Sequence, residues 1–575
     1  MVIVKAFFYL SSFTLMTFQK HDFLLLLLVI MVSACNPMPI SPSPTALPVS
    51  PTATPESVSG PALPTGPTAL WVGWLNGPDT PNPSLAQWAE AYTVFNLVYS
   101  TLFRLQPDGS YSPDLVESVV VSEDDRIWTF TIRNGAFFHD GIPLTAEDVA
   151  FSLNLYGFFG EIKALDLHTV EIRLEDPIPN MEGHLINYFI LPQHIWARYE
   201  NAPNTFDNLE MIGSGPFQMV IYQQDSFVHL KAVTDHYLSP PKIEDVIFIV
   251  YEDELLLAEA LQNGEVDMIT TLPYAEIEML QQNPQIEVAA GEPFYATMEE
   301  VVINQITPEN CPPPEEGGIC SGHPALRDLN VRRALSHATD KITLVEQVTS
   351  GYASLGVSIL PTKLGAFHNS ELQDYTYDPE LARELLDANG YLDTNNDGVR
   401  EMPDDPSQAL QFRLNFDDSN LYYRQLAEHL TEMWQEIGIS LNVEPMDVET
   451  LTAKCCPAFD YDIMLWAWQI NPEPGLFFDL FDTREIPTGY NESGYSNPNY
   501  DILNAIQHTE VDVEKRREVL WQMQDLLLKD VATIVLFYPQ TIQAYRVDRF
   551  TGWLTEGSFL ALEDVSSITQ IEPVP

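Results

Sequence analysis

Apolar and polar residues alternate in short stretches from Leu70 onward, and these stretches are interspersed with stretches of helical spacing. A period of two favours strands, and apolar residues every three or four positions favour helices. Because both patterns recur without a short internal repeat, the sequence predicts an α/β fold. Strands are expected in ALWVGWL, residues 126–133, HTVEIRL, residues 231–237 and DVIFIVYED, and helices from Thr145, in ELLLAEALQNGEVDMI and over residues 331–349, 379–389, 421–437 and 513–528.

The stretch GAFFHDGIPLTAEDVAFSL, residues 135–153, places His139 beside Asp140 and follows them with Glu147 and Asp148. A histidine among carboxylates suggests a catalytic or metal site, but local structure also explains the spacing. Thr145 is expected to cap a helix, Asp148 to reach back to it as in a capping box, and Glu147 to favour the positive end of the helix dipole. Asp140 is expected to accept backbone N–H groups in the preceding turn. We therefore interpret these residues as scaffold.

The N-terminal region contains an apolar run at residues 23–32, which follows Lys20 and His21 and ends in VSAC, with Cys35 last. This order is typical of a secretory signal, and VSAC resembles a bacterial lipobox, in which the cysteine is acylated. We expect a lipoprotein signal over residues 1–35; a plain anchor helix is the alternative, and a start at Met16 would leave a tidier signal. Residues 36–67, rich in Pro, Ser and Thr, are expected to form an extended tether.

Acidic residues outnumber basic ones by 82 to 27, which gives a formal charge of -55 at pH 7. Such a chain repels phosphate backbones, so nucleic acid is excluded as a partner. The charge either solvates the surface or concentrates cationic ligands in a cleft, and the total does not separate the two. A chain of 575 residues is too long for one compact core, so two or three lobes are expected.

Four cysteines remain after Cys35. Cys311 and Cys320 flank the loop CPPPEEGGIC and are expected to form a local disulfide, which export would permit. Cys455 and Cys456 are adjacent, and a bridge between neighbours is strained, so free thiols or another pairing remain open. No Cys/His spacing in the sequence predicts a zinc site.

Several segments follow the order of a known family. WTFTIRNGAFFHDGIPLTAEDVAFSL, from Trp128, closely resembles the signature of the family 5 extracellular solute-binding proteins, which serve peptide and nickel ABC importers. MIGSGPFQM resembles the family's Gly-Thr-Gly-Pro crossing, with Ser214 in place of threonine. Further counterparts in order, over residues 70–550, are VYSTLFRLQPDGSYSPDLVES, ALQNGEVDMI, LNVRRALSHATDKITLVEQVTSGYA, YDPELARELLDANGYLDTNNDGVRE and YDIMLWAWQINPEP.

The resemblance implies an α/β, two-lobed periplasmic-binding-protein fold (type II, with an extra domain) and a ligand cleft between lobes that close on the ligand. It implies a monomer that presents a small-molecule or peptide ligand to ABC permease subunits, with no cofactor. The lipid anchor would then hold the protein at the outer face of the cell membrane, in the periplasm or at the cell surface. The expected domains are lobe I over residues 68–105, 210–300 and 535–575, an extra domain packed on lobe I over 106–209, and lobe II over 301–534.

The segment LWAWQINPEP, residues 465–474, is the most informative one for the ligand. In peptide-binding members a tryptophan is followed three residues later by an aspartate that pairs with the ligand's α-ammonium. Trp468 matches the tryptophan, but Asn471 stands at the aspartate position. An amide can accept a hydrogen bond from an ammonium yet provides no counter-charge, and charge-assisted bonds are roughly twice as strong. Glu473 is close and could substitute, although it equally fits a structural acidic position.

Three further aromatic residues are candidates for the ligand site. Trp466 lies two residues before Trp468, so on a strand both rings would point the same way. Tyr99 and Tyr295 could stack on a ligand, although aromatic residues at such positions more often belong to a core. A pocket walled by indole rings would suit apolar side chains, sugar faces or cations.

The sequence DTNNDGVREMPD, residues 393–404, places Asp393, Asn395, Asp397 and Gly398 as in the first half of a calcium loop. An EF-hand requires a glutamate at the twelfth position, where Asp404 stands instead. A solvated acidic turn is therefore the main interpretation, and a structural calcium site is the alternative.

No HExxH, GxSxG, Walker A or strand-linked GxGxxG motif occurs, so we expect no enzyme. The family and the acidic surplus favour capture of oligopeptides or related cationic small solutes for import. An oligosaccharide is the alternative ligand, because of Asn471 and the tryptophans. A surface sensor that feeds no importer is the alternative role.

Overall fold

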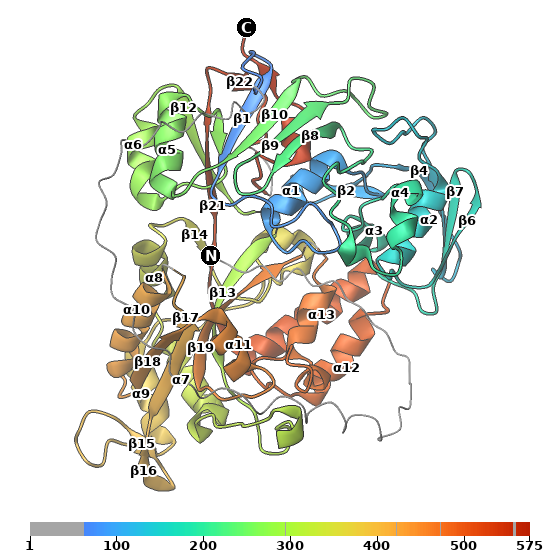
Figure 1. Ribbon diagram of the computed structural model, residues 1–575. Coiled ribbons are helices and arrows are strands. Elements are labelled where there is room, and N and C mark those ends of the chain that lie inside the picture. The colour runs from blue at the N-terminus through green and yellow to red at the C-terminus, as the bar shows by residue number, and fades with distance from the viewer. Residues whose placement is uncertain (1–62, 294, 421, 472, 556–558) are drawn as a thin grey trace, which may run out of the picture. The chain divides into compact units, whose positions relative to one another are not determined.

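The computed structural model describes residues 63–575, except Phe294, Leu421, Pro472 and residues 556–558. The predicted signal, Cys35 and most of the predicted tether lie outside the described residues. The segment Thr65–Pro575 forms one compact unit that contains several separate sheets (Figure 1). We find no helix in the described part of the chain with both the length and the apolar character to cross a membrane.

The first sheet has seven strands in the order β12-β21-β11-β1-β10-β9-β8. β1 runs parallel to β10 and β11, and β21 runs antiparallel to β11 and β12. α5 and α6 lie beside β12 (Figure 1). The strands are β1 (Ala69–Trp74), β8 (Phe217–Gln223), β9 (Phe227–Ala232), β10 (Asp245–Val250), β11 (Met268–Ile269), β12 (Ile286–Gly291) and β21 (Thr541–Arg546), and the helices are α1 (Ala89–Val98), α5 (Glu254–Asn263), α6 (Ile277–Gln281) and α14 (Val565–Ile568).

A four-stranded antiparallel sheet, β4-β5-β7-β6, is formed by residues inserted between α1 and β8. Its inner face packs on α2 around Phe130, Val149 and Ile172, which are buried. The small hairpin of β2 and β3 precedes it. The elements are β2 (Phe103–Leu105), β3 (Tyr111–Pro113), β4 (Val116–Val121), β5 (Ile127–Ile132), β6 (Glu161–Asp166), β7 (Thr169–Arg173), α2 (Ala146–Leu155), α3 (Met181–Leu185) and α4 (Gln193–Trp196).

The start of α2 confirms the structural interpretation of residues 135–153. Asp148 Oδ2 accepts hydrogen bonds from the backbone N–H and the hydroxyl of Thr145, both at 2.9 Å. Asp140 Oδ1 accepts from the Ile142 N–H at 3.2 Å, as a turn residue does. His139 accepts from the Gly213 N–H at Nδ1 and contacts the Gly215 carbonyl through Nε2, so it ties this segment to the chain entering β8. These side chains hold the scaffold together.

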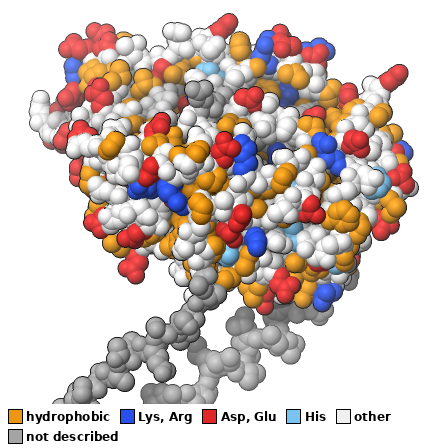
Figure 2. Space-filling view, turned by 90° about the horizontal axis from the view of Figure 1, so that it is seen from above, with side chains coloured by type: hydrophobic (Ala, Val, Ile, Leu, Met, Phe, Trp, Pro, Cys, Tyr) orange, Lys and Arg blue, Asp and Glu red, His pale blue; other side chains and the backbone are white. Residues whose placement is uncertain are grey.

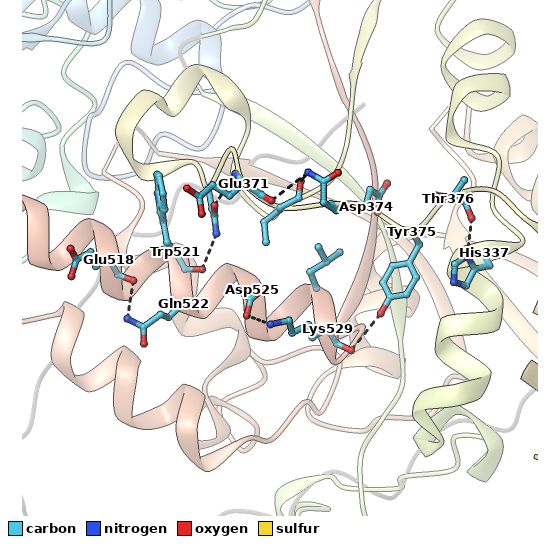
Figure 3. Close-up of a pocket in the computed structure, with 14 residues that line it drawn as sticks. His337, Glu371, Asp374, Tyr375, Thr376, Glu518, Trp521, Gln522, Asp525 and Lys529 are labelled. Carbon is cyan, nitrogen blue, oxygen red and sulfur yellow. Dashed lines mark hydrogen bonds and ion pairs between the residues drawn. The ribbon is translucent and has the colours of Figure 1, made fainter.

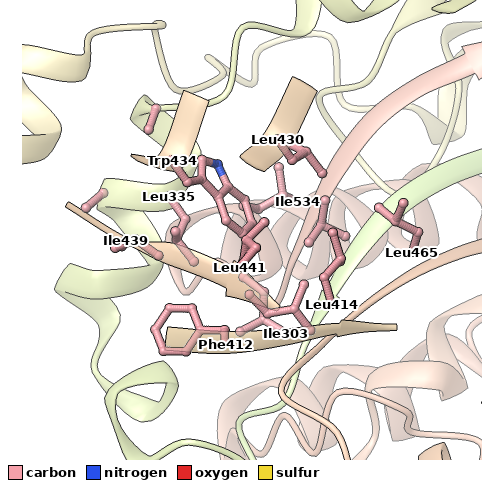
Figure 4. Close-up of a cluster of buried hydrophobic side chains, with 14 of the residues drawn as sticks. Ile303, Leu335, Phe412, Leu414, Leu430, Trp434, Ile439, Leu441, Leu465 and Ile534 are labelled. Atoms are coloured by element: carbon pink, nitrogen blue, oxygen red, sulfur yellow. The ribbon is translucent and has the colours of Figure 1, made fainter. Parts of the chain in front are cut away.

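The second large sheet has six strands in the order β14-β20-β13-β19-β17-β18. Its largest core cluster gathers Phe412, Leu414, Trp434 and Leu465 between the sheet and the helices α7 to α10 (Figure 4). The strands are β13 (Ala296–Ile303), β14 (Ala353–Leu355), β17 (Gln411–Asp417), β18 (Ser440–Met446), β19 (Ile463–Ile470) and β20 (Thr533–Pro539), and the helices are α7 (Leu329–His337), α8 (Lys341–Val348), α9 (Pro379–Ala388), α10 (Tyr423–Gln435), α11 (Val448–Cys455), α12 (Pro498–Gln507) and α13 (Val513–Lys529).

Small paired strands complete the fold: β15 (Glu401–Met402) with β16 (Asp405–Ala409), and β22 (Phe550–Thr551) with β23 (Glu572–Pro573).

The structure differs from three sequence-based expectations. The helix expected over residues 331–349 is two helices, because Asp340 caps the second by accepting from the Thr343 N–H. The strand expected at 231–237 is only the end of β9, and the chain turns after Ala232. β13 begins at Ala296 within the second sheet, and β20 continues there to Pro539, so the changes of lobe lie nearer to 292–295 and 540 than the expected boundaries at 300 and 534.

Cys311 and Cys320 form the predicted disulfide. The pairing of Cys455 and Cys456, which the sequence left open, is a bond between these two neighbours in the structure. On the face shown in Figure 2, acidic side chains are spread among apolar and basic ones and do not gather in one patch.

Candidate functional site

Two short crossings connect the two large sheets. One runs from β12 to β13 through residues 292–295, and the other runs from β20 to β21 through Gln540. β12 pairs with β21 in the first sheet and β13 pairs with β20 in the second, so the crossings lie side by side. Ser354 Oγ of β14 donates to Glu292 Oε1 at 3.1 Å, beside the first crossing. Adjacent crossings of a few residues form a hinge about which two lobes can rotate.

The two tryptophans of the LWAWQINPEP segment lie on β19, whose ladder with β13 pairs Trp468 with Met298 and Trp466 with Glu300. Both side chains are partly buried and share one face of the strand, as predicted, while Ile463 and Leu465 on the other face enter the main core. Trp468 packs on a separate cluster that includes Met298, and its Nε1 donates to Glu492 Oε2 at 3.1 Å. One edge of the indole is therefore fixed by a carboxylate.

Asn471 directly follows β19 and is exposed. The β13–β19 ladder ends with Ala296 opposite Ile470, so Asn471 and Tyr295 stand at the same end of two neighbouring strands. That end is where the first crossing enters the second sheet. The structure thus brings together two candidates that are 176 positions apart in the sequence (471 minus 295).

Glu473 is committed to other protein groups. Only 5% of its side chain is exposed, and it forms a bidentate pair with Arg516, at 2.5 Å from Nη2 to Oε1 and 3.2 Å from Nη1 to Oε2. Asn180 Nδ2 donates to Oε2 at 2.6 Å, and the Gly475 N–H donates to Oε1 at 2.9 Å. Burial opposes ionisation of Glu473, but Arg516 outweighs it and holds the pKa below its ordinary value.

This geometry corrects the expectation that Glu473 could substitute for the missing aspartate. Both of its oxygens are used, and a ligand ammonium would have to displace the buried guanidinium of Arg516. Glu473 instead links β19's end to α13 and, through Asn180, to the inserted domain.

The two candidate tyrosines have different surroundings. Tyr99 has no exposed surface, packs on Phe95 and Phe189, and accepts a hydrogen bond from Asn208 at its hydroxyl. Because its side chain has no solvent-accessible surface, Tyr99 belongs to the core of the first lobe. The structure does not support the expectation that Tyr99 lines the ligand site. Tyr295 is 38% exposed, and its hydroxyl lies 3.4 Å from Asn187 Oδ1 of the inserted domain.

Tyr295 is accessible and yet strongly desolvated. Burial raises its pKa to about 12, with smaller contributions from Asp564 and Tyr111. Tyr295 lies at the first crossing, directly before β13, and part of its side chain is open to solvent.

Three carboxyl groups missed by the sequence reasoning lie near one another: Glu90 on α1, Glu563, and Asp564 at the start of α14. Of these, Asp564 also lies near Tyr295. Burial, with smaller contributions from Asp564 and Glu90, raises the pKa of Glu563 to about 7. Burial also raises the pKa of Asp564 and of Glu90. Among the described residues, no lysine or arginine forms an ion pair with any of the three. The adjacent acids in the apolar segment FLALEDV, residues 559–565, were the available signal.

A different groove, of about 870 Å³, lies on the second lobe between residues 369–376 and α13 (Figure 3). None of the predicted ligand residues lines it. Its polar side chains are largely paired with each other or with backbone: Lys529 with Asp525, and His337 with the Thr376 carbonyl. It belongs to one lobe alone, so lobe closure would not enclose a ligand there. The crossing, with Trp468, Asn471, Tyr295 and the three carboxyls, is the stronger candidate.

Comparisons with known proteins agree with this geometry. The family model described as "Bacterial extracellular solute-binding proteins, family 5 Middle" matches residues 110–486. The oligopeptide-binding protein AppA of Bacillus subtilis is 23% identical over 495 residues, covering 83% of this chain and 87% of AppA.

Solved structures show the same fold at low identity. The ABC transporter substrate-binding protein CtaP of Listeria monocytogenes has a TM-score of 0.74 at 23% identity, over 88% of this chain and 99% of CtaP. NikZ of Campylobacter jejuni, solved in complex with Ni(L-His), has a TM-score of 0.71 at 22% identity, over 88% of this chain and all of NikZ.

Proposed function

Because this chain belongs to the bacterial extracellular solute-binding proteins of family 5, we propose that it captures oligopeptides or related cationic small solutes by lobe closure and delivers them to an ABC importer permease. Its family consists of substrate-binding proteins rather than enzymes. The two-lobed fold with two adjacent crossings supports capture by closure.

The proposal that the ligand is cationic rests on the group of carboxyls at the crossing. Asp564 lies near Tyr295, Glu563 lies near Asp564 and Glu90, and none of the three carboxyls has an ion-pair partner among the described residues. Arg104, whose charge reaches Asp564, is already paired with Asp114 at 2.7 Å. An ammonium or guanidinium group on the ligand would supply the opposite charge to these carboxylates, whereas a neutral sugar could only donate hydrogen bonds to them.

Within the site, Trp468 offers an indole face and Asn471 an amide oxygen at the end of β19. We propose that both contact the ligand, with Trp466 further along the same face and Tyr295 across from Asn471. The tryptophans and Asn471 also favour an oligosaccharide, which is the second candidate, and the test below separates the two.

To test the ligand class, the unfolding temperature of the full-length protein in detergent is measured in the presence of three sets of compounds. These are peptides with free amino termini, the same peptides N-acetylated, and oligosaccharides. A ligand that binds only the folded protein raises the unfolding temperature. We expect stabilisation by free peptides, less by acetylated ones, and loss of the effect in Trp468→Ala. Stabilisation by sugars alone would overturn the peptide assignment.

We also propose that Cys35 is lipidated and holds the protein at the outer face of the membrane. The support is the VSAC sequence after an apolar run, followed by an extended tether. Mass spectrometry of the protein extracted from membranes should show a mature chain that begins at an acylated Cys35, and Cys35→Ala should abolish this modified N-terminus. An unmodified Cys35 would contradict lipidation.

A further inference from the structure

The acidic loop at residues 393–401 closes on itself through hydrogen bonds from its backbone N–H groups. Asp393 accepts from the Asp397 N–H at 3.2 Å and from the Gly398 N–H at 3.0 Å. Gly398 has a φ of 92°, which a residue with a side chain adopts only with strain. The Glu401 N–H donates to the Leu392 carbonyl at 3.0 Å and closes the loop at its base.

The closed loop brings three carboxylates together, and one of them is buried. One oxygen from each of Asp393, Asp397 and Glu401 lies within 4.8 Å of the others. Glu401 is 2% exposed; its Oε2 accepts from the N–H and hydroxyl of Thr394, at 2.8 and 3.1 Å. Its Oε1 is buried and has no hydrogen-bond partner. A buried unpartnered carboxylate oxygen costs stability unless something binds it.

Among the described residues, no lysine or arginine side chain forms an ion pair with these carboxylates. Arg400, the neighbouring base, points away: its Nη1 lies 2.5 Å from Asp387 Oδ1 and its Nε donates to the Ile437 carbonyl at 2.7 Å. No ion pair involving Asp393, Asp397 or Glu401 occurs in the described part of the chain.

We propose that residues 393–401 bind a calcium ion through the carboxylates of Asp393, Asp397 and Glu401. Asn395 and the Val399 carbonyl stand at the intervening third and seventh positions, so oxygen donors occupy positions one, three, five, seven and nine of the loop. An all-oxygen donor set with several carboxylates fits calcium better than magnesium, which demands a near-ideal octahedron and usually keeps several waters. Glu401, at the ninth position, would supply the glutamate ligand that the twelfth residue supplies in an EF-hand.

The site is structural. It lies between α9 and the β15–β16 pair, away from the crossing, so calcium binding stabilises this part of the second lobe without touching the ligand residues. A protein that does not bind calcium would therefore not contradict the proposed ligand capture, and a protein that captures no peptide would not contradict the calcium site.

The test is calorimetric titration of chelator-treated full-length protein in detergent with calcium chloride, and separately with magnesium chloride, together with thermal unfolding. We expect calcium to bind with a Kd of about 0.1–1 mM or tighter and to raise the unfolding temperature. Glu401→Gln and Asp397→Asn should each weaken binding by at least about tenfold. Asp397 lies on the exposed loop, so its variant keeps the test valid where Glu401→Gln folds poorly.

Asp404→Asn is the matched control: the residue is exposed, stands at the twelfth position and is not among the clustered carboxylates. It should bind calcium as the wild type does. Absence of binding to the wild type, equal binding of magnesium, wild-type affinity in both loop variants, or a loss in Asp404→Asn as large as in Glu401→Gln would each overturn the proposal.

Discussion

At the scale of single residues, Asn471 occupies the position where the resemblance to peptide-binding members leads us to expect an aspartate. Its exposed place at the end of β19, level with Tyr295, leaves room for a ligand amine. Asn471→Asp should strengthen binding of a peptide with a free amino terminus by about tenfold, because a charge-assisted hydrogen bond is about twice as strong as a neutral one. Titration calorimetry measures the change.

The controls for this variant separate a local contact from added charge. An N-acetylated peptide should show no gain, because it has no ammonium. Asn201→Asp adds the same charge on an exposed turn of the inserted domain and should leave affinity unchanged. A gain that is equal for both peptides would contradict a direct contact between residue 471 and the ligand amine.

Glu473, two residues further on, should behave as a structural residue. Glu473→Gln leaves Arg516 buried without its counter-charge, which should lower the free energy of unfolding by about 3–5 kcal/mol in ligand-free protein. Glu514→Gln is the matched control, since it breaks the exposed pair with Arg517 on the same helix and should cost less than about 1 kcal/mol. Urea unfolding that shows equal small losses would refute the structural role.

At the scale of elements, α2 shows how a local sequence pattern sets a helix start. Asp148 accepts from Thr145 and, through its other oxygen, from the Gln193 N–H at 3.0 Å at the start of α4. Asp148→Ala should therefore lower the free energy of unfolding by about 1–2 kcal/mol or more, and Glu147→Ala, exposed on the same turn, by less than about 1 kcal/mol. Urea unfolding checks both. Ligand affinity should stay unchanged, and a loss of binding in Asp148→Ala would return this stretch to the functional site.

The same comparison shows what sequence alone can predict. Caps, alternation and turns are local, so α2, β5 and, on a strand, the shared face of Trp466 and Trp468 follow from residues near each other in the chain. Glu473 and Glu401 could not be assigned this way, because Arg516 and the fold of the 393–401 loop decide their surroundings. The place of Tyr99 in the core could not be predicted for the same reason, because its burial depends on Phe189 and Asn208, about a hundred positions away.

At the scale of the whole molecule, the charge of -55 matters where carboxyls are held close together. On the outer face in Figure 2 acidic groups are dispersed and solvated. At the crossing, burial keeps Glu563 partly protonated near neutral pH, and its pKa of about 7 lies above the ordinary 4.5. Without ligand, this group of carboxyls therefore carries less negative charge than the sequence suggests, and we expect a bound cation to favour ionisation of Glu563.

This linkage gives a pH dependence with a definite sign. Between pH 4.5 and 7 the folded protein keeps a proton on Glu563 that the unfolded chain has released, so this group's contribution to stability falls as pH rises through that window. A cationic ligand favours the ionised carboxylate, so its binding should strengthen as pH rises from 5.5 to 7 and then level off. Each pH unit well below the pKa should change affinity by up to about tenfold.

Glu563→Gln should remove the part of this dependence that Glu563 contributes, as measured by calorimetric titration of a cationic peptide across the pH range. Glu299 is the matched control: burial raises its pKa to about 7 as well, but Tyr422 and Tyr423 donate to it in the second lobe. Glu299→Gln should leave the pH dependence of binding intact even where it changes stability. A dependence that persists in Glu563→Gln and disappears in Glu299→Gln would place the ligand's cation away from the crossing, because only the carboxyl that meets the cation can couple its proton to binding.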